Sequence, residues 1–290
     1  MYPFGATLAS YITSQNREIL FISKLAKTDG SKAVRGGIPL VFPQFGQPNK
    51  DMPSHGFLRC NYWQTLTDTV YDNDNEAGCE FKLELKDAKS ETRGDSIWAA
   101  GDDDDDKVDC TVLFKVVVKP TSLTTTLTIQ NTGSKSFDYQ TLLHTYYKIN
   151  GSKALCKTSC NVVGLEGYNV DDKITNEKST QDSTPIAIDR EVDRIYTPTE
   201  ATSNNLNVVI CTGDDGSKVG LKATCKDHDE KEVPVSVVVW NPFVDKAKRL
   251  GDFDDDEYHD MLCVEPGILS GNEGIAPGKS VSFEQVISSI

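Results

Sequence analysis

The chain is short of positive charge. Its 290 residues include 30 Lys and Arg against 44 Asp and Glu, so the formal net charge is 30 − 44 = −14. A negative field of this kind repels phosphate backbones and anionic lipid headgroups. The composition therefore disfavours nucleic acid and membrane as partners, and an anionic small molecule would need a local cluster of cations.

Long apolar runs are also missing. No stretch approaches the roughly 18 residues of a membrane-spanning helix, and the opening MYPFGATLAS lacks the basic and apolar regions of a signal peptide. The eight cysteines are scattered, several within apolar runs, which is typical of buried free thiols rather than a disulfide framework. We therefore expect a cytoplasmic protein, and we take it to be a monomer.

Metal-binding spacings are scarce. None of the four histidines belongs to an HxH or HExxH pattern, and the CxxxC spacing of Cys156 and Cys160 is weak evidence for a metal. The acidic runs at 102–107 and 252–260 are more typical of solvated loops than of ligand sets. We expect neither a metal nor a cofactor.

Convincing helical patterns are absent apart from one possible turn in DKAKRLGDF, and a period of two dominates instead. VDCTVLFKVVVK and LTTTLTIQN alternate apolar and polar residues on either side of a short turn, which predicts an antiparallel hairpin. Further predicted strands are EILFIS, CEFKLELKD, FDYQTLLHTYYKI, LNVVICT, VPVSVVVW and SVSFEQVIS. We predict an all-β fold, a large antiparallel β-sandwich forming a single domain over residues 1–290.

One loop concentrates cations. RGGIPLVFPQFGQPNKDMPSHGFLR, from Arg35 to Arg59, contains two arginines, one histidine, four glycines and four prolines. So many breakers exclude a helix or a long strand. The segment is either an ordinary surface loop or a stiff scaffold for binding groups.

Three further side chains are candidates for a site. In FDYQTLLHTYYKI, His144 shares one strand face with Gln140 and Tyr146, as on the floor of a ligand cleft, although a lone strand histidine is more often structural. Glu265 ends the apolar run of MLCVEPG, so we expect it partly desolvated at a strand end, with its pKa raised towards that of a general base. Asp193 in EVDRIY could accept hydrogen bonds from sugar hydroxyls or pair with a neighbour.

The motifs in their order along the chain resemble a known family. They are RGGIPLVFPQFG, SHGFLR, LLHTYYKI, EVDRIY, VWNPF, GDFDDDEYHDMLCVEPG and APGKSVSF. Together they resemble the hexose-6-phosphate mutarotases, the glucose-6-phosphate 1-epimerase branch of the aldose 1-epimerase superfamily. The resemblance covers almost the whole chain and implies a large β-supersandwich and a hexose phosphate as small-molecule partner.

The resemblance also implies residue roles. It makes His144 the general acid and Glu265 the general base of anomer interconversion. It assigns substrate binding to five residues: Arg35, Ser54, His55, Arg59 and Asp193. Ser54 stands where relatives often have Gln.

Three alternatives stay open from the sequence. The first is an epimerase of unphosphorylated aldoses, and the second is a non-catalytic carbohydrate-binding sandwich, because a fold hosts many functions. In the third, the relevant role of the enzyme is association with another protein.

Overall fold

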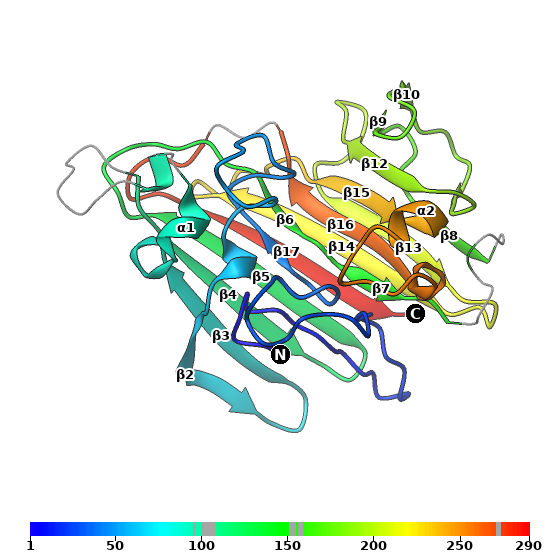
Figure 1. Cartoon of the computed structure of the whole chain (residues 1–290), viewed down its shortest axis with the longest axis horizontal. Coiled ribbons are helices and arrows are strands. Elements are labelled where there is room, and N and C mark those ends of the chain that lie inside the picture. Colours follow the sequence, from blue (N-terminus) through cyan, green and yellow to red (C-terminus); the bar gives the residue numbers. More distant parts are fainter. Residues whose placement is uncertain (95–96, 100–107, 151–154, 156–158, 271–273) are drawn as a thin grey trace.

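Two antiparallel β-sheets make up most of the molecule (Figure 1). The structure is a computed structural model, and it describes the chain apart from residues 95–96, 100–107, 151–154, 156–158 and 271–273. The predicted all-β antiparallel sandwich is confirmed. The acidic run at 102–107 and Cys156 lie outside the described residues.

The first sheet has eight strands. In spatial order they are β1 (Leu40–Val41), β6 (Thr141–Leu143), β16 (Met261–Ile268), β15 (Ser236–Asn241), β12 (Val192–Thr197), β9 (Asn169–Asp172) and β10 (Lys178–Thr180), with β7 (Tyr146–Lys148) also paired to β16. Because β16 and β15 are buried along their whole length, the centre of this sheet is covered on both faces.

The second sheet has nine strands. In spatial order they are β11 (Ile186–Ala187), β8 (Cys160–Val163), β13 (Leu206–Thr212), β14 (Lys218–Asp227), β17 (Ser280–Ser289), β5 (Ser122–Asn131), β4 (Cys110–Val118), β3 (Ala77–Glu84) and β2 (Gln64–Asp72). The helices are short: α1 (Ser90–Arg93), α2 (Phe243–Ala247), and the 3-10 turns η1 (Leu58–Cys60), η2 (Leu85–Asp87), η3 (Ile97–Ala99) and η4 (Glu257–Asp260). Among the described residues, no helix is long and apolar enough to cross a membrane.

The predicted strands are largely present, with two corrections. The predicted hairpin is confirmed as β4 paired with β5. The segment EILFIS is not a regular strand, because it makes only isolated bridges such as Leu20 to Tyr147. The strand predicted over 137–149 is broken into β6 and β7, since the chain leaves the ladder between Leu143 and Tyr146.

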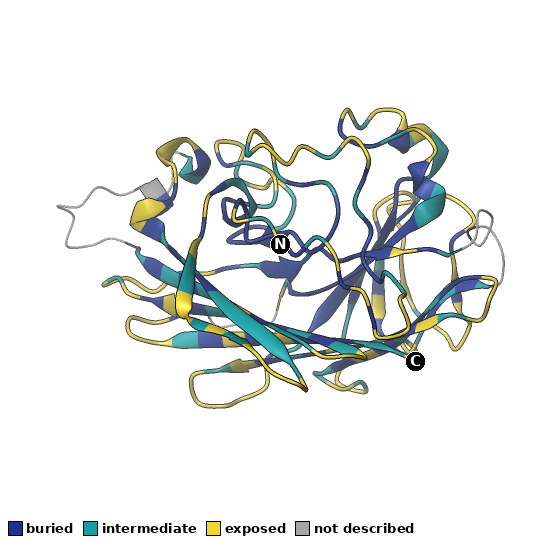
Figure 2. Cartoon of the chain, turned by 90° about the horizontal axis from the view of Figure 1, so that it is seen from below, coloured by how far each residue is buried: buried dark blue, intermediate teal, exposed yellow. Residues whose placement is uncertain are grey.

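The main core lies between the two sheets, where buried residues are concentrated (Figure 2). One polar link crosses it: the Thr145 hydroxyl donates to Gln285 on β17 over 2.9 Å, and the Gln285 amide donates to Thr125 on β5. All three side chains are fully buried. Thr145 therefore points towards the second sheet, and its neighbours His144 and Tyr146 face away from it.

The N-terminal segment continues the first sheet beyond β6 and β7. The Tyr146 amide donates to the Gly37 carbonyl over 2.9 Å, and the His144 amide donates to the Pro39 carbonyl over 3.0 Å. The Arg35-to-Arg59 loop is thereby held beside the strand region that carries His144. Six of the described cysteines are free thiols, as predicted: Cys60, Cys79, Cys110, Cys211, Cys225 and Cys263.

Candidate active site

Strand register brings the candidate residues onto one face of the first sheet. Asp193 on β12 pairs with Trp240 on β15, which pairs with Cys263 on β16, which pairs with Tyr146 on β7. Directly opposed residues of antiparallel strands point to the same side, so the four form a row across the sheet. Glu265, two residues after Cys263, shares that face.

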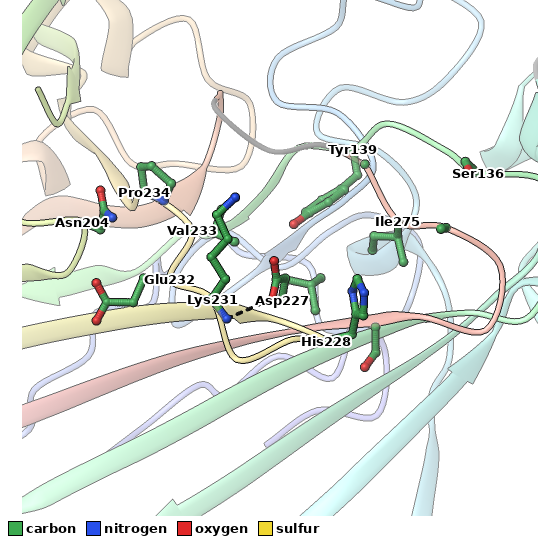
Figure 3. A pocket seen from close by; sticks show the side chains of 14 residues that line it. Ser136, Tyr139, Asn204, Asp227, His228, Lys231, Glu232, Val233, Pro234 and Ile275 are labelled. Atoms are coloured by element: carbon green, nitrogen blue, oxygen red, sulfur yellow. Dashed lines mark hydrogen bonds between the residues drawn. The ribbon is translucent and has the colours of Figure 1, made fainter. Parts of the chain in front are cut away.

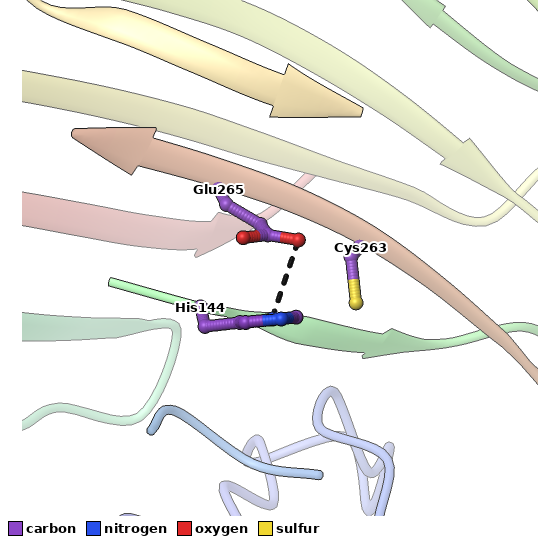
Figure 4. A group of neighbouring side chains, drawn as sticks. All are labelled: His144, Cys263 and Glu265. Atoms are coloured by element: carbon purple, nitrogen blue, oxygen red, sulfur yellow. Dashed lines mark ion pairs between the residues drawn. The ribbon is translucent and has the colours of Figure 1, made fainter. Parts of the chain in front are cut away.

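His144 and Glu265 meet at the centre of this face (Figure 4). The Nδ1 of His144 lies 3.3 Å from Oε1 of Glu265, and the two side chains are 8% and 2% exposed. The contact is not a hydrogen bond, and neither His144 Nδ1 nor Glu265 Oε2 has a hydrogen-bond partner among the described residues. Both atoms therefore keep hydrogen-bonding capacity that no described protein group satisfies.

The expected position of Glu265 at a strand end is wrong. The strand continues to Ile268, and Glu265 lies opposite Val238 in its interior. Burial is consequently deeper than the sequence suggested. The tetrad Val-Glu-Pro-Gly stays extended because Pro266 and Gly267 both keep their places in the ladder.

Burial shifts both ionisable groups in opposite directions. It raises the pKa of Glu265 well above its usual value, and the nearby Asp193 charge adds to this, whereas Arg59 opposes it. Burial lowers the pKa of His144 well below its usual value, assisted by His55 and the two arginines. The carboxylate is thus a stronger base than an exposed one, and the imidazolium is a stronger acid.

Arg35 is held rigidly next to the pair. Its guanidinium donates to the Asp252 carboxylate over 3.1 Å and 3.2 Å and to the Tyr146 hydroxyl over 3.1 Å. The Tyr146 ring stacks on the His144 ring, with centroids 4.8 Å apart and planes 8° apart. Arg35 is therefore one side chain away from His144, and its charge is partly neutralised by Asp252.

Arg59 differs from Arg35 in its partners. Its guanidinium donates to the Ser54 backbone carbonyl over 2.8 Å, while its Nε is buried without a hydrogen-bond partner. Within the described part of the chain, no carboxylate lies within ion-pair distance of Arg59. Its charge lies near enough to affect the pKa values of both His144 and Glu265. Ser54 is exposed and contributes its backbone here.

His55 lies against His144, with ring centroids 5.6 Å apart. Its backbone has a positive φ of 66°, which His tolerates better than most residues. The Gly46 amide donates to His55 Nδ1 over 3.2 Å, so Nδ1 is the acceptor and the ring hydrogen is on Nε2. The neutral ring thus keeps one N–H that can be donated to a ligand.

We expect His55 to stay neutral far into the acidic range. Burial and the charges of Arg59 and Arg35 lower its pKa to about 3. Because the unfolded chain takes up this proton near pH 6.5 and the folded chain does not, the free energy of unfolding should fall as the pH drops below 6.5, by about 1.4 kcal/mol per pH unit from this group. Ring nitrogen NMR shifts check the titration, and His55→Asn is the non-titrating control. A titration midpoint near 6 would contradict the assignment.

Asp193 lies at the rim of the face rather than in its centre. Its side chain is 26% exposed, and its Oδ2 lies 3.2 Å from Nζ of Lys246 on α2. Lys246 also pairs with Glu191 over 3.2 Å and lies 5.9 Å from the centre of the Trp240 ring. The site therefore has a buried floor and a half-exposed rim.

Sequence reasoning missed two buried carboxylates in the run 252–260. The run 252–260 was interpreted as a solvated turn, yet Asp252 and Glu257 are each only 2% exposed. Asp252 pairs with Arg35 and Lys32, and Glu257 accepts hydrogen bonds from the Ser23 hydroxyl and two backbone amides. Phe253 and Tyr258, apolar residues within the run, were the available signal of burial.

A separate cavity of about 380 Å³ lies elsewhere, where the segments around Asp227–Pro234 and Gly274–Val281 meet (Figure 3). Its lining includes Tyr139, His228 and Lys231 but none of the predicted site residues. The chemistry-bearing cluster and this cavity are therefore different places in the molecule. We assign the candidate active site to the cluster, because among the described residues it is there that an acid, a base and two guanidinium groups converge.

Comparison with known proteins agrees with this fold. Residues 1–288 match the family model described as aldose 1-epimerase. A Cenchrus ciliaris protein and an Escherichia coli K12 protein, both provisionally named glucose-6-phosphate 1-epimerase, are each 28% identical; the matches cover 96% and 98% of this chain and 77% and 84% of theirs. A Salmonella typhimurium structure provisionally described as a mutarotase has the same fold, with a TM-score of 0.75 and 23% identity over 99% of this chain and 85% of its own.

Proposed function

Because the chain belongs to the aldose 1-epimerase family, we propose that it interconverts the α and β anomers of hexose 6-phosphates. The family makes it an isomerase of the mutarotase type. The observation that carries the proposed mechanism is the His144–Glu265 contact of 3.3 Å, close enough to two arginines for their charges to act on His144. The names of the relatives support the phosphate ester.

In the proposed reaction, Glu265 is the base and His144 is the acid. Oε2 of Glu265 removes the proton of the C1 hydroxyl while Nδ1 of His144 protonates the ring oxygen, so the C1–O5 bond breaks and the sugar opens to the aldehyde. Rotation about C1–C2 exposes the other carbonyl face. The hydroxyl at C5 then re-adds to C1, and both protons return along the same paths.

The shifted pKa values suit this exchange. The pair carries one transferable proton in either arrangement: a neutral acid with a neutral imidazole, or a carboxylate with an imidazolium. Since moving the proton within the pair changes no net charge, the active form is reached without exchange with solvent. Tyr146, stacked on the His144 ring, fixes the plane in which Nδ1 is presented.

Arg59 is the proposed phosphate ligand. Arg35 already shares its charge with Asp252, whereas the Arg59 guanidinium is free of carboxylates among the described residues. A planar guanidinium can donate two parallel hydrogen bonds to a phosphate. In a chain of net charge −14, such a group also provides the local attraction that an anionic sugar needs.

Polarimetry of freshly dissolved α-glucose 6-phosphate and α-glucose tests the proposal, with and without protein. We expect Arg59→Ala to lower kcat/KM for the phosphate ester by about 10–150-fold more than for free glucose, because only the ester loses a charge-assisted hydrogen bond of about 1.5–3 kcal/mol. Equal losses on both sugars would favour an epimerase of unphosphorylated aldoses.

The matched control is Lys115→Ala, which removes one positive charge from an exposed position of β4 in the other sheet. We expect it to leave both rates unchanged, so that a general effect of net charge is separated from a local one. Absence of any acceleration by the unmodified protein, on either sugar, would leave a carbohydrate-binding sandwich as the better interpretation.

A further inference from the structure

The floor of the candidate active site contains a third potential ligand atom. The sulfur of Cys263, a nitrogen of His144 and a carboxylate oxygen of Glu265 all lie within 4.8 Å of one another (Figure 4). Cys263 takes no part in the proposed proton transfers. A thiol, an imidazole and a carboxylate are the three donor types that zinc takes in proteins.

The spacing fits a small tetrahedral ion. Bonds of 2.0–2.3 Å to N, O and S place tetrahedral ligand atoms about 3.3–3.8 Å apart. Nδ1 of His144 and Oε1 of Glu265 are already 3.3 Å apart, so only the Cys263 sulfur and small side-chain rotations are needed to complete a set. Three protein ligands leave a fourth position open to water.

The site is built into the sheet rather than formed by chance at the surface. Cys263 and Glu265 are alternate residues of β16 and point to the same side, and His144 follows β6 across the ladder. All three residues are buried. In addition, His144 Nδ1 and Glu265 Oε2 are buried polar atoms without hydrogen-bond partners, an arrangement that calls for a ligand.

We propose that His144, Cys263 and Glu265 bind a soft divalent cation such as Zn²⁺, and that the bound ion inhibits the enzyme. The ion occupies the nitrogen and the carboxylate needed for proton transfer, so inhibition is competitive with the sugar. Mg²⁺ prefers six oxygen ligands and is not expected to bind. The inhibition rests on the proposed function, whereas the binding does not. Sequence spacing could not reveal this metal site, because His144 lies far along the chain from Cys263 and Glu265.

Binding is tested on the purified full chain by calorimetric titration with Zn²⁺ and by the absorption of the Co²⁺ form. We expect one Zn²⁺ per chain and a thiolate-to-cobalt charge-transfer band. Loss of a neighbouring hydrogen-bond partner typically costs 10–100-fold in metal affinity, so removal of the ligand itself in Cys263→Ser should weaken binding by more than about 100-fold and abolish the band.

Cys211→Ser is the matched control, because it removes a thiol from β13 in the other sheet. It should leave affinity and absorption unchanged. Equal Zn²⁺ affinity in Cys263→Ser and the unmodified chain, or no binding at all, would overturn the proposal.

Inhibition is measured separately as the dependence of the anomerisation rate on free Zn²⁺, each variant being compared with its own metal-free rate. We expect the inhibition constant to match the measured dissociation constant, and the Zn²⁺ concentration that halves the rate to rise with substrate concentration. A chain that binds Zn²⁺ through Cys263 but has no epimerase activity would refute the proposed function and leave the metal site standing. An active enzyme that fails to bind Zn²⁺ would refute the metal site and leave the proposed function standing.

Discussion

Replacing Glu265 by Gln is expected to lower kcat for the anomerisation by about 10²–10⁴-fold, the usual contribution of one general acid–base group. The amide keeps the shape of the side chain but cannot accept the C1 hydroxyl proton. Single-turnover exchange NMR between the α and β anomers measures the loss directly. A variant that retains more than a tenth of the rate would exclude Glu265 as the base.

The same substitution should not destabilise the fold. Glu265 is 2% exposed at its side chain and its Oε2 has no hydrogen-bond partner, so the folded protein gains little from the carboxylate. Removing a buried, poorly paired ionisable group is often neutral or stabilising. We therefore expect loss of activity with an unchanged or higher urea midpoint, which a purely structural role of Glu265 would not produce.

Glu257→Gln is the contrasting control. Glu257 is equally buried, but its carboxylate accepts hydrogen bonds from the Ser23 hydroxyl and from the Lys24 and Asp254 amides. Each bond to a charged group contributes about 1.5–3 kcal/mol, and part of this is lost when an amide replaces the carboxylate. This variant should unfold at lower urea and keep its turnover number, the opposite pattern to Glu265→Gln.

The local pattern of the strands was predictable from the sequence because alternation is a property of neighbouring residues. In the segment 137–149 the predicted faces are those of the structure: Thr145 and Tyr147 face the core, and His144 and Tyr146 face the site. The break between β6 and β7 does not change which side each residue points to. The face of His144 could therefore be predicted even though the strand boundaries could not.

The partners of the site residues could not be predicted, since they are distant in the sequence. Asp252 looks like one acid among several, yet it neutralises Arg35, 217 positions earlier. Composition around Asp252 contains no information about that contact. The same holds for Lys246 on α2. Its two carboxylate partners are Asp193 on β12 and Glu191, which directly precedes that strand.

Proline and glycine do not always mark the end of a strand, because a glycine can also be required for close packing. Pro-Gly after Glu265 predicted the end of a strand, yet Gly267 stays in the ladder opposite Leu142. A Cβ on Gly267 would lie 2.7 Å from the Thr141 carbonyl oxygen. The glycine is there because the neighbouring backbone passes close by, which only the three-dimensional arrangement reveals.

Gly56→Ala is expected to destabilise the protein more than Gly46→Ala, the matched glycine substitution in the same loop. Gly56 has a φ of +73°, and a Cβ there would lie 1.9 Å from the Phe42 carbonyl oxygen. That oxygen also accepts the Phe57 amide over 3.0 Å. The added methyl group must push away a backbone segment that is itself hydrogen-bonded, so it cannot be accommodated by a side-chain rotation.

Gly46→Ala separates this clash from the backbone preference. Gly46 has nearly the same φ, +68°, but no atom lies within 4 Å of its added Cβ. A left-handed conformation alone costs about 1–3 kcal/mol. Urea unfolding should therefore show this loss for Gly46→Ala and a clearly larger one for Gly56→Ala, with weaker binding of the sugar phosphate because His55 and Arg59 flank the displaced segment. Equal losses of unfolding free energy in the two variants would mean that the backbone at Phe42 moves aside at little cost. The loop would then be too flexible to fix the positions of His55 and Arg59.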